Sequence, residues 1–182
     1  MAVDYDALKR IGRDLLVAIG EDPDREGIVD TPQRFARWWR EFIDYDPGTM
    51  DTTFKAENSD AIVAVTGVRV WSLCEHHLLP FSSTLAMAYI PQGRVLGLSK
   101  FARIAHNVAH RLQLQERLVN EIADEIEAAT GSPDVAIIGS GEHLCMTMRG
   151  VRTYGSMRTS VMRGVFHDED RARAEFLMLV KE

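Results

Sequence analysis

The sequence has little cysteine, no excess of positive charge and no long apolar run. Its two cysteines among 182 residues exclude a scaffold held together by disulfides. The 21 Lys and Arg residues are outnumbered by 27 Asp and Glu residues, so the formal net charge is -6. A general nucleic-acid binder needs a basic face, and a membrane span needs about 20 consecutive apolar residues. We therefore expect neither a nucleic-acid partner nor a membrane partner.

The remaining composition is that of a globular protein. Apolar residues make up 46% of the chain and charged residues 26%, which is enough apolar material for one domain core. Residues 1–6 lack the basic region and the apolar core of a secretory signal peptide, so we expect a cytoplasmic protein. In that reducing environment the two cysteines need a purpose other than a disulfide.

The N-terminal part of the sequence predicts a helical arm. Apolar residues recur there at steps of three and four, as in an amphipathic helix: Leu8, Ile11, Leu15 and Ile19. Thr31-Pro32 then predicts a second helix, with a capping hydroxyl before a ring that favours the first helical position. Pro47-Gly48 and the polar run after it mark a seam. We expect an arm over residues 1–58 and a main domain over residues 59–182.

The main domain mixes strand and helix patterns, which indicates an α+β fold with a mainly antiparallel sheet. Ser99 is expected to cap a helix that starts at Lys100, and the helical period continues to Ile126, either unbroken or with a break near Arg111. A turn at 91–94 predicts a hairpin between the strands on either side of it. The expected strands are 61–71, 81–90, 95–97, 135–138, 143–151 and 159–166, and a last helix is expected over 168–180.

The segment Cys74-Glu75-His76-His77 is typical of a metal site. A Cys and a His three residues apart can bind one metal ion from a single turn of chain. Cys145 is the other thiol of the sequence, and two thiolates with one imidazole form a catalytic type of zinc set that leaves one position for water. The alternatives are that both cysteines are small buried apolar residues, or that His76 or His143 completes a four-ligand structural site.

The run from His143 to Arg149 is interpreted as a strand whose alternate side chains share a face. His143, Cys145 and Arg149 would then point the same way, placing an imidazole and a guanidinium beside the thiol. This makes His143 a candidate proton carrier, and His76, beside the metal-binding segment, is a second one.

Two further groups of residues suit an anionic nucleotide. Ser99, Lys100 and Arg103 lie at an expected helix start, where free N–H groups and the helix dipole bind phosphate. The alternative is an ordinary capped surface helix. Glu116 could be a plain surface carboxylate, or it could accept two hydrogen bonds from a ring N–H and an amino group, as guanine offers.

Taken together, these residues resemble the type I GTP cyclohydrolase family, a family of zinc enzymes of pterin biosynthesis. The resemblance extends from about Leu8 to Phe176, with blocks in family order and spacing. The matching blocks are residues 20–27, 31–34, 72–81, 89–91, 95–100, 111–118, 143–146 and 149–151.

The resemblance implies a role for each candidate residue. Zinc would be held by Cys74, His77 and Cys145, and His76 and His143 would act as acid–base groups. Glu116, with Gln115 beside it, would anchor the guanine. The triphosphate contacts would be Ser99, Lys100, Arg103, Arg149 and, reaching the site of a neighbouring subunit, Arg34.

The resemblance also implies a reaction, a fold and an assembly. The reaction is GTP plus water to 7,8-dihydroneopterin triphosphate and formate, the first step of tetrahydrofolate and pterin biosynthesis. The fold is the tunnelling fold (T-fold), an antiparallel sheet with two long helices on one face. The assembly is a homodecamer of two stacked pentamers, with active sites between subunits.

The sequence departs from the family pattern at three places, and two other functions are considered. Ser83-Thr84 replaces the usual Gly-Lys, His110 a common basic residue, and Met157-Arg158 a Lys-Thr pair. Another zinc-dependent purine nucleotide hydrolase or deaminase is the first alternative, but the His-x-Glu and Pro-Cys-x2-Cys signatures of deaminases are absent. The second is a non-catalytic assembly or pterin-binding module, which the retained metal ligands and proton carriers disfavour.

Overall fold

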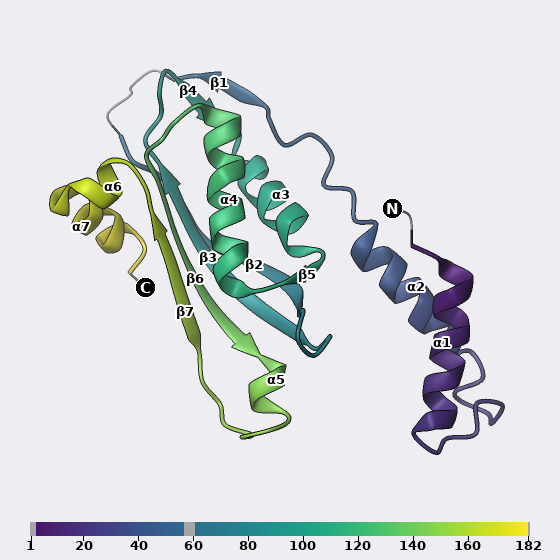
Figure 1. Cartoon of the computed structure of the whole chain (residues 1–182). Helices are drawn as coiled ribbons and strands as arrows, with labels where there is room; N and C mark the ends of the chain where they lie inside the picture. The colour runs from purple at the N-terminus through teal and green to yellow at the C-terminus, as the bar shows by residue number, and fades with distance from the viewer. Residues whose placement is uncertain (1–2, 57–60, 182) are drawn as a thin grey trace. The chain divides into compact units, whose positions relative to one another are not determined.

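A computed structural model of the chain describes residues 3–56 and 61–181 (Figure 1). The chain divides into two compact units, Met1–Asp46 and Pro47–Glu182. Among the described residues, no helix has both the length and the apolar character needed to cross a membrane.

The first unit is a pair of helices, as the apolar periodicity predicts for the first and Thr31-Pro32 for the second. α1 (Tyr5–Ala18) begins after Asp4, whose carboxylate accepts a hydrogen bond from a backbone N–H of the first turn. α2 (Thr31–Ile43) packs against α1, and a Cβ added to Gly12 of α1 would lie 3.0 Å from the ring of Phe35. A methyl group at this position would crowd Phe35 and the backbone of Pro32, so Gly12 favours the close approach of the two helices.

The capping prediction for α2 is wrong by one residue. Asp30, not Thr31, is the N-cap residue, and it makes no side-chain capping hydrogen bond. The helix begins at Thr31 because Pro32, in the first turn, has the backbone angle that a helix needs and no N–H to leave unpaired.

The second unit contains a five-stranded sheet in the order β5-β2-β3-β6-β7 (Figure 1). Neighbouring strands are antiparallel except for the short parallel pair of β2 and β5. The strands are β2 (Val63–Cys74), β3 (Pro80–Tyr89), β5 (Leu112–Gln113), β6 (Val135–His143) and β7 (Met157–Met162). The predicted α+β class with a mainly antiparallel sheet is confirmed.

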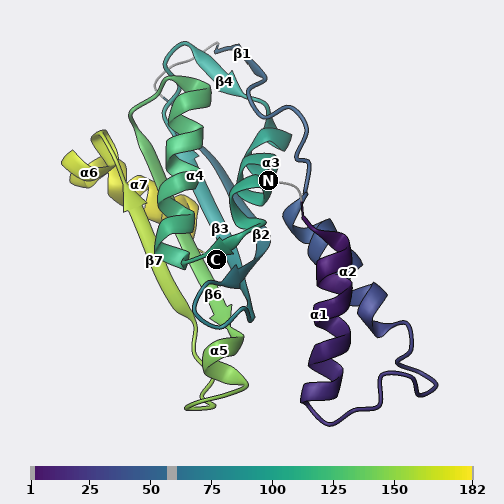
Figure 2. The same ribbon diagram turned by 45° about the vertical axis from the view of Figure 1, so that its right-hand side comes forward.

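Helices cover both faces of this sheet. α3 (Leu98–Ala109) and α4 (Gln115–Thr130) lie side by side on one face (Figure 2), and the large core forms beneath them. Met87 belongs to this core, whereas its neighbour Ala88 belongs to a second cluster with α6 (Val165–Asp168) and α7 (Asp170–Leu179). Because successive side chains of a strand point to opposite faces, α6 and α7 cover the other face.

The predicted hairpin across residues 91–94 is wrong. The strand after this turn is β4 (Arg94–Leu96), which pairs with β1 (Thr53–Lys55) in a separate two-stranded sheet. The backbone N–H of Leu96 donates instead to the phenolic oxygen of Tyr89, at 2.6 Å.

The helical run after Ser99 is broken, as one of the two alternatives predicts. α3 ends at Ala109, and the chain then forms β5 beside β2 before α4 begins. Ser99 is not the N-cap, because α3 begins at Leu98 after Gly97.

The strand predicted over residues 143–151 is also wrong. β6 ends at His143, and residues Leu144–Thr147 form the short helix α5. His143 pairs with Phe81, and the partner strand begins one residue earlier, at Pro80, which has no N–H to donate. With no ladder left to extend, the chain turns, so the strand alternation inferred beyond His143 does not hold.

We expect Tyr89→Phe to destabilise the second unit. The change leaves the Leu96 N–H without its acceptor in a buried position, which costs about 1–3 kcal/mol. The thermal midpoint at fixed protein concentration measures the effect. Tyr154→Phe, a change at a side chain that is 79% exposed, is the matched control and should leave the midpoint unchanged. An equal midpoint for both variants would contradict the role given to the phenol.

Candidate functional site

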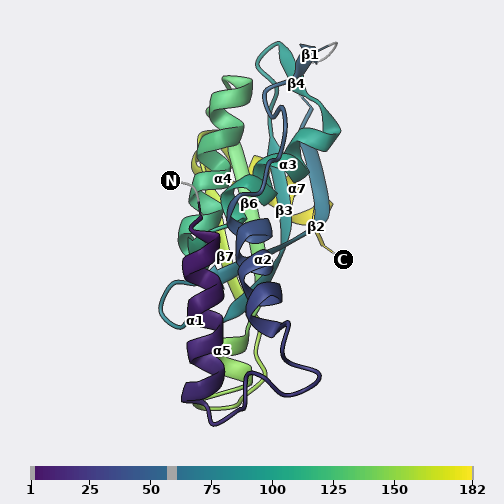
Figure 3. The same cartoon turned by 90° about the vertical axis from the view of Figure 1, so that its right-hand side faces the viewer.

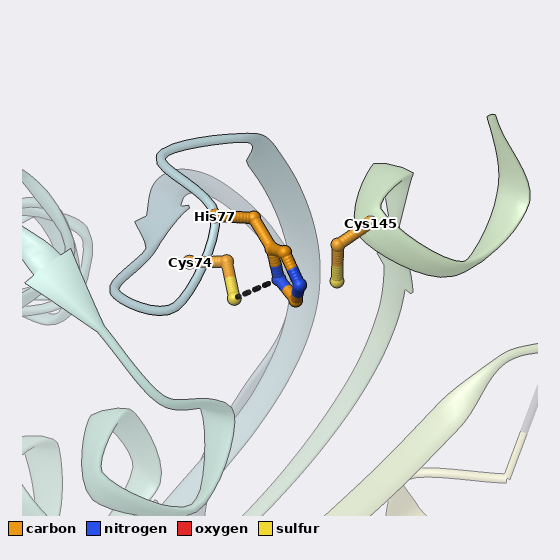
Figure 4. Close-up of side chains that lie close together, drawn as sticks. All are labelled: Cys74, His77 and Cys145. Carbon is orange, nitrogen blue, oxygen red and sulfur yellow. Dashed lines mark hydrogen bonds between the residues drawn. The ribbon is translucent and has the colours of Figure 1, made fainter. Parts of the chain in front are cut away.

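Three donor side chains from distant parts of the sequence meet at one end of the sheet, beside the ends of its inner strands. β2 ends at Cys74, next to the first residues of β3, and β6, antiparallel to β3, ends at this same end of the sheet. Cys74, His77 and Cys145 therefore come together, and their donor atoms all lie within 4.8 Å of one another (Figure 4). This group is close enough to bind a metal ion.

The turn after β2 places two of the three donors. The carbonyl of Cys74 accepts hydrogen bonds from the N–H groups of His77 and Leu78, at 3.3 and 2.8 Å. Leu78 adopts a φ of 55°, which is uncommon outside glycine and closes the turn tightly. His77 Nδ1 consequently lies 3.8 Å from the sulfur of Cys74.

The chemistry of the donor set fits zinc. Two thiols and an imidazole are the ligand types that this ion prefers, and three protein ligands leave one position open. Burial raises the pKa of the Cys145 thiol and the nearby Cys74 raises it further, whereas Arg149 opposes the shift. Since metal ligands bind in the deprotonated form, a cation between the two sulfurs would replace their protons.

His143 lies beside this group on a rigid support. Its ring stacks on Phe81 with centroids 4.6 Å apart and an interplanar angle of 4°. Its Nε2 lies 2.9 Å from Oε1 of Gln115. Burial lowers the pKa of His143, and the carboxylate of Glu116 acts in the opposite direction. Glu116 is exposed in the first turn of α4.

The amide of Gln115 determines which nitrogen of His143 carries hydrogen. The Gln115 side chain is buried, and its Nε2 lies within 3.3 Å of three acceptors, on Gly139, Met157 and Thr159. Two of these acceptors are backbone carbonyls, so the NH2 group must face them and Oε1 must face the histidine. Oε1 only accepts, so His143 Nε2 donates, and Nδ1 is the atom that exchanges a proton.

Sequence reasoning missed this support for His143. Gln115 is predicted only as a neighbour of the guanine anchor, and Phe81 and Gly141 are given no role. A Cβ on Gly141 would collide with Gln115 Oε1 and would lie 2.8 Å from the carbonyl of Ser82. The signal in the sequence is a glycine within a strand, which indicates a close approach by another group.

His76 lies at the rim of the donor group. Its Nδ1 is 3.9 Å from the sulfur of Cys74, nearly as close as that of His77, and both histidines are exposed, but only His77 belongs to the three-residue set. The two histidines therefore differ in their approach to Cys145, because only His77 has a donor atom within 4.8 Å of both sulfurs.

The predicted phosphate contacts of α3 lie in the first half of that helix, away from the donor group. Lys100 Nζ donates to the carbonyl of Thr49, and Arg103 donates to that of Pro47, both at 2.8 Å. α3 ends near Cys74, since Arg111, just after it, accepts a hydrogen bond from Leu73. A helix of 12 residues is about 18 Å long. The cations thus lie toward the end of the sheet that carries β1 and β4, away from α5 (Figure 3).

The two remaining predicted contacts belong to other elements of the chain. Arg149 follows α5, is exposed, and acts electrostatically on Cys145. Arg34 belongs to α2 in the first compact unit, where it forms an exposed ion pair with Asp30 at 3.4 Å.

Comparison with known proteins assigns the chain to a family. A family model described as GTP cyclohydrolase I matches residues 8–181. The chain belongs to the GTP cyclohydrolase I family. GTP cyclohydrolase 1 of Hyperthermus butylicus is 44% identical over 181 residues, which cover 100% of this chain and 93% of that protein. GTP cyclohydrolase 1 of Thermoanaerobacter pseudethanolicus is 45% identical over 183 residues, with coverages of 98% and 97%. The solved structure of the archaeosine synthase QueF-Like in its apo form is similar to 59% of the chain, at 19% identity and a TM-score of 0.45.

The departures from the GTP cyclohydrolase I pattern leave the donor group intact. Ser83 is buried, and its Oγ has no hydrogen-bond partner among the residues that the structure describes. His110 caps the end of α3, with Nδ1 2.6 Å from the carbonyl of His106. Met157 contributes its backbone carbonyl to Gln115, a contact that does not depend on the side chain.

We expect the two adjacent histidines to differ in metal binding. His77→Ala should lose the stoichiometric binding of Zn2+ because it removes one of the three donors, whereas His76→Ala should keep it. Metal content after dialysis against a weak chelator measures this. Loss of Zn2+ from His76→Ala to the same extent as from His77→Ala would contradict the assignment of the donor.

Proposed function

We propose that this chain is a zinc-dependent GTP cyclohydrolase that converts GTP and water to 7,8-dihydroneopterin triphosphate and formate. This is the first step of tetrahydrofolate and pterin biosynthesis. Membership of the GTP cyclohydrolase I family supports the activity. The observation that carries the residue assignment is the meeting of Cys74, His77 and Cys145 beside a histidine held in one orientation.

The donor group would hold the zinc ion. Zinc in a site with three protein ligands supplies Lewis-acid activation of water at neutral pH. Free thiols as ligands are compatible with the reducing cytoplasm, which is the location that we propose.

His143 would be the principal proton carrier. Its Nδ1 is the exchanging atom because Gln115 holds Nε2, and the stacking of Phe81 fixes the ring plane. A purine placed beside the donor group needs a proton on its five-membered ring before the C8–N bond can break. His76, exposed at the rim, would serve as a second carrier in the later steps.

Glu116 would recognise the guanine. Its exposed carboxylate, in the first turn of α4, can accept hydrogen bonds from the ring N–H and the amino group. Gln115 would contribute through His143, since both ends of its amide are already engaged.

The triphosphate would bind to cations from more than one chain. Ser99, Lys100, Arg103, Arg149 and Arg34 are the proposed contacts. Lys100 and Arg103 lie toward the end of the sheet away from the donor group, and Arg34 belongs to the other compact unit. The distance of Lys100 and Arg103 from the donor group of the same unit supports active sites formed between subunits. We propose the T-fold, a helical arm over residues 1–58, a catalytic domain over residues 59–182, and a homodecamer of two stacked pentamers.

We expect the purified zinc-loaded protein to release formate from GTP and to yield a pterin after oxidation, seen by its ultraviolet absorption. Cys145→Ala should lose zinc and activity together, because it removes a donor. His143→Ala should keep zinc and lose turnover by about 10²–10⁴-fold, the usual contribution of a general acid–base group. Release of ammonia instead of formate would indicate a deaminase, and intact GTP would refute the proposal.

We expect two inactive variants to restore activity when they assemble together. The Cys145→Ala variant lacks one of the three metal donors. A double variant, Lys100→Ala with Arg103→Ala, lacks two of the cations. In a jointly refolded equal mixture, sites built from one intact half of each chain should give about a quarter of wild-type activity. Mixing the assembled variants without refolding is the control. A jointly refolded mixture as inactive as the separate variants would place both halves in one chain.

A further inference from the structure

The acidic residue between the metal donors is bound to the start of α4. Glu75 lies in the turn between Cys74 and His77, and its two carboxylate oxygens accept hydrogen bonds from the two terminal nitrogens of Arg117, at 2.7 and 3.1 Å. Such a fork-on-fork contact fixes the direction of both groups as well as their separation.

Arg117 is badly placed to stabilise the helix that carries it. It is the third residue of α4, where the helix dipole favours negative charge. A cation here is unfavourable for α4 by itself. The contact with Glu75 explains its presence.

The pair is also too exposed to be explained by stability. The side chains of Arg117 and Glu75 are 41% and 29% exposed, and ion pairs in contact with water contribute little to folding free energy. What a bidentate arginine supplies in such a position is geometry.

The main chain supports the same turn from the other side. Glu75 donates its N–H to the carbonyl of Gln113, at 3.2 Å, and Cys74 pairs with Gln113 in the parallel ladder of β2 and β5. Gln113 is itself buried, and its Nε2 donates to Glu121 of α4 at 2.6 Å. The segment just before α4 and the first turn of α4 therefore both hold the turn.

The third donor, Cys145, is linked to the same turn of α4 through His143. Cys145 lies two residues after His143, and His143 is bound by Gln115, the first residue of α4. Arg117 contacts the turn that carries Cys74 and His77, and Gln115 contacts His143, close in sequence to Cys145. The first turn of α4 thus connects the two segments that supply the metal donors.

We propose that Glu75 and Arg117 are positioning residues of the metal site, holding the turn that carries Cys74 and His77 at the correct separation from Cys145. This inference rests on the proposed zinc site. Partners outside the ligand set commonly change metal affinity by about 10–100-fold when removed, and the Glu75–Arg117 pair acts in this way through the backbone of the turn.

The test is the affinity for Zn2+ alone, measured by competition with a chromophoric chelator. Glu75→Gln and Arg117→Met should each weaken binding by about 10–100-fold. The double variant should bind Zn2+ as tightly as the single variant with the lower affinity, because both changes remove the same interaction. Arg117→Lys should fall between, since lysine keeps the charge but cannot form the fork.

Glu127→Gln is the matched control. It weakens another ion pair of α4, with Arg163 at the far end of the helix, and should leave zinc affinity unchanged. Melting of the zinc-free proteins by circular dichroism checks that each variant is folded. Should Arg117→Met fail to fold, Glu75→Gln and Arg117→Lys carry the comparison.

The outcomes separate this inference from the proposed function. A wild-type chain that binds no zinc would refute the proposed function. Tight binding by the wild type, with Glu75→Gln and Arg117→Met within twofold of it, would refute the positioning role alone. If the losses of zinc affinity add in the double variant, the two residues act separately, and their joint positioning role is refuted.

Discussion

The buried amide of Gln115 is the constraint on which the site depends. An unpaired amide in the core is costly, and this one is satisfied only when α4 begins where β6 and β7 present their carbonyls. The same contact requires Gly141, because a side chain there would occupy the space of the amide oxygen. Satisfying one polar group therefore fixes the start of a helix, the register of that helix on the sheet and the ring of His143.

The directions of the next two residues follow from helix geometry. Successive side chains of an α-helix are about 100° apart, so Gln115, Glu116 and Arg117 point to the sheet, to solvent and to the turn after β2. One helix turn thus binds His143, the proposed proton carrier, presents the carboxylate proposed for guanine and contacts the turn that carries two of the proposed metal donors. Rigid support of this kind is what a catalytic group needs to keep its geometry.

The charge distribution matches a site shared between chains. The chain carries a net charge of -6, yet four of the five predicted phosphate contacts are cationic, and two of them, Lys100 and Arg103, lie in the half of α3 away from the donor group. Lys100 and Arg103 are held by the backbone carbonyls of Thr49 and Pro47, which keeps two cations together in the first two turns of α3. An acidic average therefore accompanies a local basic surface, which is what an anionic substrate requires.

The sequence by itself determined the chemistry and the class of fold. Residue type and local spacing identified Cys74, His77 and Cys145 as one possible donor set, and apolar periodicity predicted the helices of the arm and the α+β class. It could not determine the path after His143, because that depends on where the partner strand begins, at Pro80. The break before α4 remained open for the same reason, since β5 forms only beside β2. The contacts of Gln115 with His143 and of Arg117 with Glu75 join residues distant in the chain. Only the tertiary structure decided them, because hydrogen bonds between distant segments depend on packing and leave no local pattern in the sequence.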